Sequence, residues 1–168
     1  MTNRIDFINI DGRLNTEYLP FFECYTCFPE KIGHIKSISI ASVELPVSFI
    51  VDASNECIAN PRYVYLEIIG NENHNNRENN HLFASSIFCS RIGKYILARI
   101  TLDYQNYPCG SILPANISNG LLITGTRKYH KPIHMKGIYF RLLNELGIPI
   151  ICKDDNISFC FQIECANE

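Results

Sequence analysis

Residues 35–49 have the sequence IKSISIASVELPVSF, the strongest β pattern in the chain. Ile38 and Ile40 are two positions apart, so they share one face of an extended strand. Val43 and Leu45 form a second pair of this kind, three residues further on. Because side chains alternate between the two faces of a strand, a regular strand would place the two pairs on opposite faces. The hydrophobic pattern therefore changes phase within one strand.

The change of phase falls at Ala41-Ser42. A strand that must keep its apolar side chains on one core needs a bulge or a bend at such a point. Pro46 then has no N–H to give to a neighbouring strand, so it is expected to end the pairing. Together these features predict a long, bent strand in a closed β architecture.

Short extended segments recur along the rest of the chain, separated by turn residues, and no long helical period competes with them. The last segment alternates most clearly, with apolar residues at 157, 159, 161 and 163 and polar or small residues between them. The predicted strands are residues 18–27, 34–45, 62–69, 82–88, 94–102, 120–124, 134–143 and 157–165.

Eight antiparallel strands in two sheets are typical of a jelly roll, so the predicted fold is all-β, an eight-stranded antiparallel single jelly-roll sandwich. The predicted organisation is an N-terminal arm, residues 1–17, and one jelly-roll domain, residues 18–168. An immunoglobulin-like sandwich usually has a core tryptophan, and this chain has none. The short segment Arg141–Leu146 is interpreted as the end of a strand that turns at Gly147.

The composition is that of a globular protein: 168 residues, of which 46% are hydrophobic and 19% charged, with a net charge of −2. Lysines and arginines are scattered along the sequence, which predicts no direct binding of nucleic acid. No apolar run approaches the ~20 residues of a membrane helix, so no membrane span is expected. The first residues lack the apolar core of a signal peptide, so the eight cysteines are expected to be reduced and the protein to be made in the cytosol.

Four segments of the chain resemble the penton-type single jelly-roll minor capsid proteins of nucleocytoplasmic large DNA viruses and virophages. They occur in the family's order: IDGR at 10–13, SVELP at 42–46 followed by Phe49, YILARI at 95–100 and ISFCFQIE at 157–164. Two positions depart from the family pattern. Gly12 stands where serine is usual, and Val47 stands where asparagine is common.

The resemblance implies a structural capsid protein, the penton subunit that closes the five-fold vertices of an icosahedral large DNA virus. It also implies a homopentamer that contacts the major capsid protein and other minor capsid proteins, assembled in the host cytoplasm and located in the virion capsid. Another minor capsid component and a receptor- or glycan-binding β-sandwich are the alternatives. A glycan-binding sandwich would need aromatic residues on its loops, and the loops at 70–81 and 106–118 offer only Tyr107.

Patterns that would indicate an enzyme are missing from the sequence, so no catalytic, cofactor-binding or metal site is predicted. Cys24-x-x-Cys27 has no second pair of zinc ligands at suitable spacing, and its thiols would point to opposite faces of a strand. The five histidines include no His-x-His pair, and no Gly-x-Ser-x-Gly nucleophile elbow occurs.

Arg13 and Glu44 are the candidate contact residues, because each is a charge beside an apolar segment within the resemblance. Two interpretations remain open at this point. Both side chains lie at a rim in water, or they form an ion pair that ties the N-terminal arm under the sandwich or to a neighbouring subunit.

Overall fold

The computed structural model describes residues 3–12, 23–47, 51–52, 61–70, 96–151 and 156–166. The regular secondary structure of these residues is nearly all β, and every strand pairing is antiparallel, which confirms the all-β class. The strands are β1 (Arg4–Asp11), β2 (Glu23–Pro46), β3 (Val51–Asp52), β4 (Tyr63–Gly70), β5 (Ile96–Thr101), β6 (Ile112–Asn116), β7 (Leu122–Thr124), β8 (Arg127–Leu143), β9 (Ile150–Ile151) and β10 (Ser158–Cys165).

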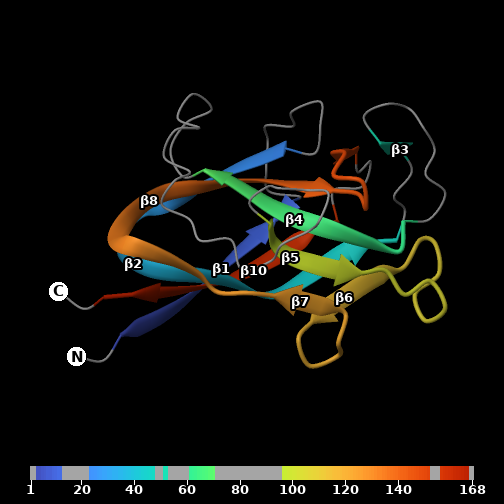
Figure 1. The fold of residues 1–168 in the computed structure, drawn as a ribbon, viewed down its shortest axis with the longest axis horizontal. Helices are drawn as coiled ribbons and strands as arrows, with labels where there is room; N and C mark the ends of the chain where they lie inside the picture. Colours follow the sequence, from blue (N-terminus) through green and yellow to red (C-terminus); the bar gives the residue numbers. More distant parts are fainter. Residues whose placement is uncertain are drawn as a thin grey trace.

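One curled sheet contains most of these strands, in the order β1-β10-β2-β8-β4-β5-β7, with β6 paired to the end of β2. Strands β3 and β9 form a separate pair. The two longest strands, β2 and β8, run side by side around the bend at the left of Figure 1 and carry the sheet from one layer to the other. The result is a half-barrel with its core between the two layers.

The bend has a local cause in the pairing of β2 with β8. Between Cys27 and Ser37 the register shifts three times, so residues of one strand are repeatedly left without a partner on the other. Such bulges interrupt the ladder and let a strand turn. His34 lies within this irregular stretch and adopts a left-handed backbone with φ 56°.

The bulge predicted from the phase change in β2 is confirmed. Phe161 of β10 pairs with Ile40, and Cys160 pairs with Ser42, so Ala41 is the extra residue. The bulge restores the phase of the strand, and Ile40 and Val43 both lie in the core. β2 also ends at Pro46, as its missing N–H predicts.

The alternation predicted for the last strand is confirmed as well. Its apolar residues are fully buried, and the residues between them are half-buried: Ile157, Phe159, Phe161 and Ile163 inside, Ser158, Cys160, Gln162 and Glu164 outside. The ring of Phe140 on β8 packs edge-on against Phe159, with centroids 4.8 Å apart, and lies 6.4 Å from Phe161. This aromatic cluster joins the two layers at the centre of the core.

Several element boundaries differ from the prediction. Residues 4–11, expected in the arm 1–17, form β1 and pair along their whole length with β10. Residues 23–27 of the strand predicted at 18–27 and the whole strand predicted at 34–45 belong to the single strand β2, and residues 18–22 lie outside the described residues. Residues 112–116, expected in the loop at 106–118, form β6. Pro132 is tolerated at the bend because the regular ladder pairing is interrupted there. Pro114 is tolerated in β6 because β6 is a short strand beside the end of β2.

The turn predicted after β8 is confirmed. Side-chain Oδ1 of Asn144 accepts hydrogen bonds from the backbone N–H groups of Leu146 at 2.8 Å and Ile148 at 3.0 Å, and Gly147 has φ 82°. Glycine adopts such a left-handed conformation without steric cost. The strand predicted at 82–88 and most of the loop predicted at 70–81 lie outside the described residues.

Candidate functional site

An open hollow of about 390 Å³ lies where three strands end or begin. The end of β1 contributes Asp11, the end of β2 contributes Glu44, and the start of β10 contributes Ser158. Gly110 and Ile112, just before and at the start of β6, complete the described lining together with the residues that precede β10. The walls are therefore both polar and apolar.

Three of the four segments quoted from the sequence meet at this hollow, although they are far apart along the chain. β1 pairs with β10 and β10 pairs with β2, so the IDGR, ISFCFQIE and SVELP segments lie on adjacent strands. The backbone N–H of Gly12 donates to the carbonyl of Ile157 at 2.7 Å and extends the β1–β10 pairing beyond Asp11. The YILARI segment, described from Ile96 onward, lies apart from them, on β5 in the other layer.

Glu44, a predicted contact residue, is exposed at the rim of the hollow. Its Oε2 accepts a hydrogen bond from the hydroxyl of Ser158, 2.8 Å away on the neighbouring strand. Arg13 lies outside the described residues, so an ion pair between Arg13 and Glu44 stays a prediction. Sequence reasoning did not identify Ser158 as a partner because the contact depends on the register of two distant strands.

Beyond Glu44, the chain closes one side of the hollow through a compact turn. The backbone N–H of Val47 donates to the carbonyl of Ser111 at 2.8 Å, and the backbone N–H of Gly110 donates to the carbonyl of Val47 at 3.2 Å. Gly110 has φ 90°, a conformation in which glycine alone is relaxed. The hydroxyl of Ser111 donates to the carbonyl of Pro108 at 2.7 Å and holds the turn from within.

Strand β1, which leads to the hollow, is the end strand of the sheet. Ile5 and Phe7 point away from the core and are 55% and 59% exposed. Within the described residues, only one edge of β1 has a partner strand, which leaves N–H and C=O groups along the other edge for pairing. An apolar outer face beside an open edge is a typical contact surface for another chain.

The start of β1 is fastened to its neighbours through Glu164. Its carboxylate accepts hydrogen bonds from the hydroxyl of Ser37 on β2 and from the side-chain amide of Asn3, whose Oδ1 in turn accepts from Lys36 Nζ. These bonds favour the charged form, so they lower the pKa of Glu164, the Ser37 hydroxyl being the largest cause. These bonds hold the start of β1, and the hydrogen bond from Gly12 to Ile157 holds the chain just after its end.

The thiols near this surface are not activated. Burial raises the pKa of Cys160 and of Cys165, which keeps both in the weakly nucleophilic thiol form. Cys24 and Cys27 lie within β2, where the sequence placed them in a strand, and Cys27 is an exposed free thiol. Among the described residues, no group of three or more histidine, cysteine or acidic side chains is placed to hold a metal ion.

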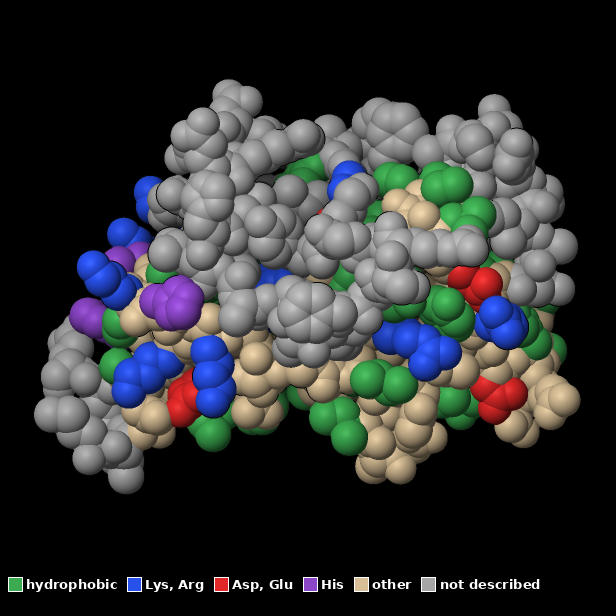
Figure 2. Space-filling view, in the orientation of Figure 1, with side chains coloured by type: hydrophobic (Ala, Val, Ile, Leu, Met, Phe, Trp, Pro, Cys, Tyr) green, Lys and Arg blue, Asp and Glu red, His purple; other side chains and the backbone are tan. Residues whose placement is uncertain are grey.

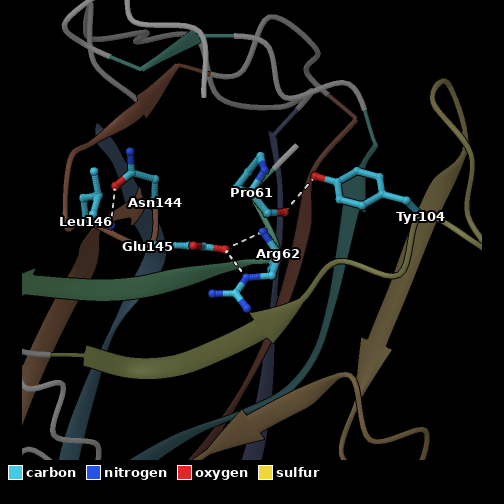
Figure 3. Close-up of polar contacts among 6 residues, drawn as sticks. All are labelled: Pro61, Arg62, Tyr104, Asn144, Glu145 and Leu146. Carbon is cyan, nitrogen blue, oxygen red and sulfur yellow. Dashed lines mark hydrogen bonds and ion pairs between the residues drawn. The ribbon is translucent and has the colours of Figure 1, made fainter. Parts of the chain in front are cut away.

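A second polar cluster, absent from the sequence-based candidates, joins the loops beside β4 (Figure 3). Oε1 of Glu145 accepts from the backbone N–H of Arg62 at 2.6 Å and lies 3.4 Å from its guanidinium Nε. The hydroxyl of Tyr104 donates to the carbonyl of Pro61 at 2.8 Å, and burial, followed by the nearby Glu145, raises its pKa to about 12. The cluster fixes loops rather than presenting a reactive group.

A scan against protein-family models finds no match, and a search of curated proteins finds no similar sequence. In the described part of the chain, no helix has the length and apolar character needed to cross a membrane.

Proposed function

We propose that this protein is a structural capsid subunit, a single jelly roll that forms a homopentamer and closes the five-fold vertices of an icosahedral large DNA virus. The observation that carries the proposal is the convergence of three capsid-like segments on adjacent strands around one hollow. Segments that resemble a family only in sequence need not meet in space. Here they adjoin an exposed strand suited to a subunit contact.

A five-fold ring requires a heterologous contact, in which two different surfaces of the subunit meet. Strand β1 supplies one of them: it is eight residues long, has a partner strand on only one edge among the described residues, and exposes Ile5 and Phe7. The other end strand, β7, has only three residues and offers far less backbone for pairing. Each contact is repeated around the axis, so a single contact can be modest, and major and minor capsid proteins at the vertex supply the remaining ones.

A role as another minor capsid component is the nearest alternative, and it would use the same strand away from the vertex. A receptor- or glycan-binding sandwich is less well supported, because the described loop tyrosines are not displayed for stacking. Tyr107 packs against the core, and the hydroxyl of Tyr104 is already bonded to a backbone carbonyl. The resemblance implies no cofactor for the capsid role and places the protein in the virion after cytoplasmic assembly.

The experiment tests whether β1 carries assembly. In infected cells, a copy of the chain with Phe7→Asp should be made and folded but not incorporated into virions, because the charge lies where the neighbouring subunit packs. Leu146→Asp is the matched control, since Leu146 is 52% exposed in the turn between β8 and β9, outside β1, and should be incorporated normally. Equal incorporation of both variants, with circular dichroism confirming their folds, would contradict a contact through β1.

A further inference from the structure

The sequence predicts no basic patch because lysines are scattered along it, but the fold brings five of them together. Lys31 and Lys36 lie on β2, and Lys128, Lys131 and Lys136 lie on β8, all at the bend shared by these two strands. Figure 2 shows lysine and histidine side chains gathered at this end of the molecule. We call residues 30–36 and 128–136 the basic bend.

At both ends of the basic bend, the side chains of β8 alternate between exposed and buried positions. Lys128, His130, His134 and Lys136 are exposed, whereas Tyr129 and Met135 between them are buried. The ring of His134 packs edge-on against His34 of β2, with centroids 5.1 Å apart, so the two strands present one continuous surface. Same-face side chains of an extended strand are about 6–7 Å apart, so His130 and His134 lie on the exposed face between Lys128 and Lys136.

The basic bend and the rest of the chain carry net charges of opposite sign. It contains five lysines and one acidic residue, Glu30, a net charge of +4, in a chain whose total is −2, so the remaining residues carry −6. Glu164 faces this end from β10, and its charge interacts with Lys36 and Lys128. Lys31, Lys131 and Lys136 therefore remain as the cations best placed to bind an external anion.

We propose that the basic bend binds the phosphate backbone of double-stranded nucleic acid without sequence preference. A cluster of lysine charges suits the closely spaced phosphates of a duplex, and lysine binds phosphates as a compact charge without the planar fork with which arginine reads bases. None of the large, exposed apolar side chains of the described residues lies in the basic bend, so neither stacking on bases nor insertion between lipids is provided for. The inference does not depend on the capsid role.

The test measures binding of the full chain to labelled duplexes of about 30 base pairs and two unrelated sequences, between about 50 and 200 mM salt. Each phosphate contact contributes a slope of about −0.9 to log K against log salt, so three contacts predict a loss of about 40-fold across this range. Both duplexes should bind alike. The variant Lys31→Gln/Lys131→Gln/Lys136→Gln should lose most of this slope and at least about tenfold in affinity at the low salt concentration.

Arg62→Gln is the matched control, because the Arg62 side chain is 83% exposed and lies outside the basic bend. The affinity of this variant should stay within about twofold of that of the unaltered chain, since the substitution removes one charge outside the basic bend. An unchanged slope in the triple variant would overturn the proposal, as would no binding to either duplex. Binding to vesicles of equal parts phosphatidylcholine and phosphatidylserine, without binding to the duplexes, would assign the basic bend to membranes and also overturn it.

Discussion

The outer faces of β10 and β4 differ, although both strands bury every second residue in the core between the layers. On β10 the outward residues Cys160, Gln162 and Glu164 are half-exposed, as an alternating pattern with one solvated face predicts. On β4 the outward residues are buried too, with Tyr65 6% and Glu67 3% exposed. Alternation therefore shows which side chains share a face, but not whether the second face meets water.

The buried outer face of β4 has its own small core. Tyr65 packs there with Ile96 of β5 and Leu143 of β8. Glu67 forms an ion pair with Arg141 of the adjacent strand, which gives the buried carboxylate a partner. This layer is thus held from both sides, whereas the layer of β1, β10 and β2 is held mainly from within.

The largest effect is expected at the aromatic cluster that both layers share. Phe161→Ala should lower the free energy of unfolding by about 3–5 kcal/mol, because the ring is fully buried beside Phe140 and Phe159. Phe7→Ala is the matched control on the solvated side of β1, and it should change stability by less than about 0.5 kcal/mol. Urea denaturation measures both. Similar losses for the two variants would remove the distinction between the core and the outer face of β1.

The second effect compares an ion pair on the outer face of β4 with one on β1. Glu67→Leu should destabilise by about 2–4 kcal/mol, since it leaves the partly buried Arg141 without its carboxylate. Glu67→Leu/Arg141→Leu should recover most of that loss, because an apolar pair of similar volume fits a buried site. On β1, Asp6→Leu should cost less than about 1 kcal/mol, since the Arg4–Asp6 pair is largely in water. Equal losses at Glu67 and Asp6 would mean that the outer face of β4 is hydrated.

The third effect appears in the pH dependence of stability. The pKa of Glu164 is lowered in the folded protein, so this carboxylate stabilises the fold fully above the ordinary glutamate pKa of about 4.3 and loses its contribution as pH falls through the lowered value. Glu164→Gln should flatten unfolding free energy against pH in this acidic window. Ser37→Ala, which removes the largest cause of the shift, should flatten it in the same direction. An identical acid slope in all three proteins would contradict the Glu164 contacts.

The smallest effect is expected at the rim of the hollow. Ser158→Ala removes the hydrogen bond to the exposed Glu44 and should change stability by less than about 1 kcal/mol, because water replaces the lost donor. Thermal unfolding checks this value. A loss of several kcal/mol would show that the Ser158–Glu44 contact is shielded from solvent and belongs to the core of that layer.

Local patterns predicted what depends on neighbours in sequence. The phase change around Ala41 predicted the bulge, and the alternation of apolar residues predicted the buried face of β10, because both follow from the two-residue period of a strand. At Arg4–Asp11 the apolar residues 5, 7, 8 and 10 fall on both faces of a strand, so their pattern did not indicate one buried face. These residues were assigned to an arm by resemblance, and their pairing with β10 joins opposite ends of the chain.

The rest depends on register between distant strands. Lysines at 31 and 36 meet those at 128–136 only because β2 and β8 bend together, and no local pattern contains that pairing. The contact of Ser158 with Glu44 has the same origin, although Glu44 itself was a candidate from sequence. The burial of Glu67 was likewise hidden, because its outward position on β4 resembles that of a solvated residue.

The most direct test of the capsid proposal is the position of this chain in the virion. An icosahedral reconstruction of purified particles should show five copies of the half-barrel around each five-fold axis, with the edge of β1 against the next copy. Residues 1–12 and Glu44 should lie at or near that contact. Density for the chain only away from the five-fold axes, or its absence from purified virions, would contradict the proposed role as the vertex subunit.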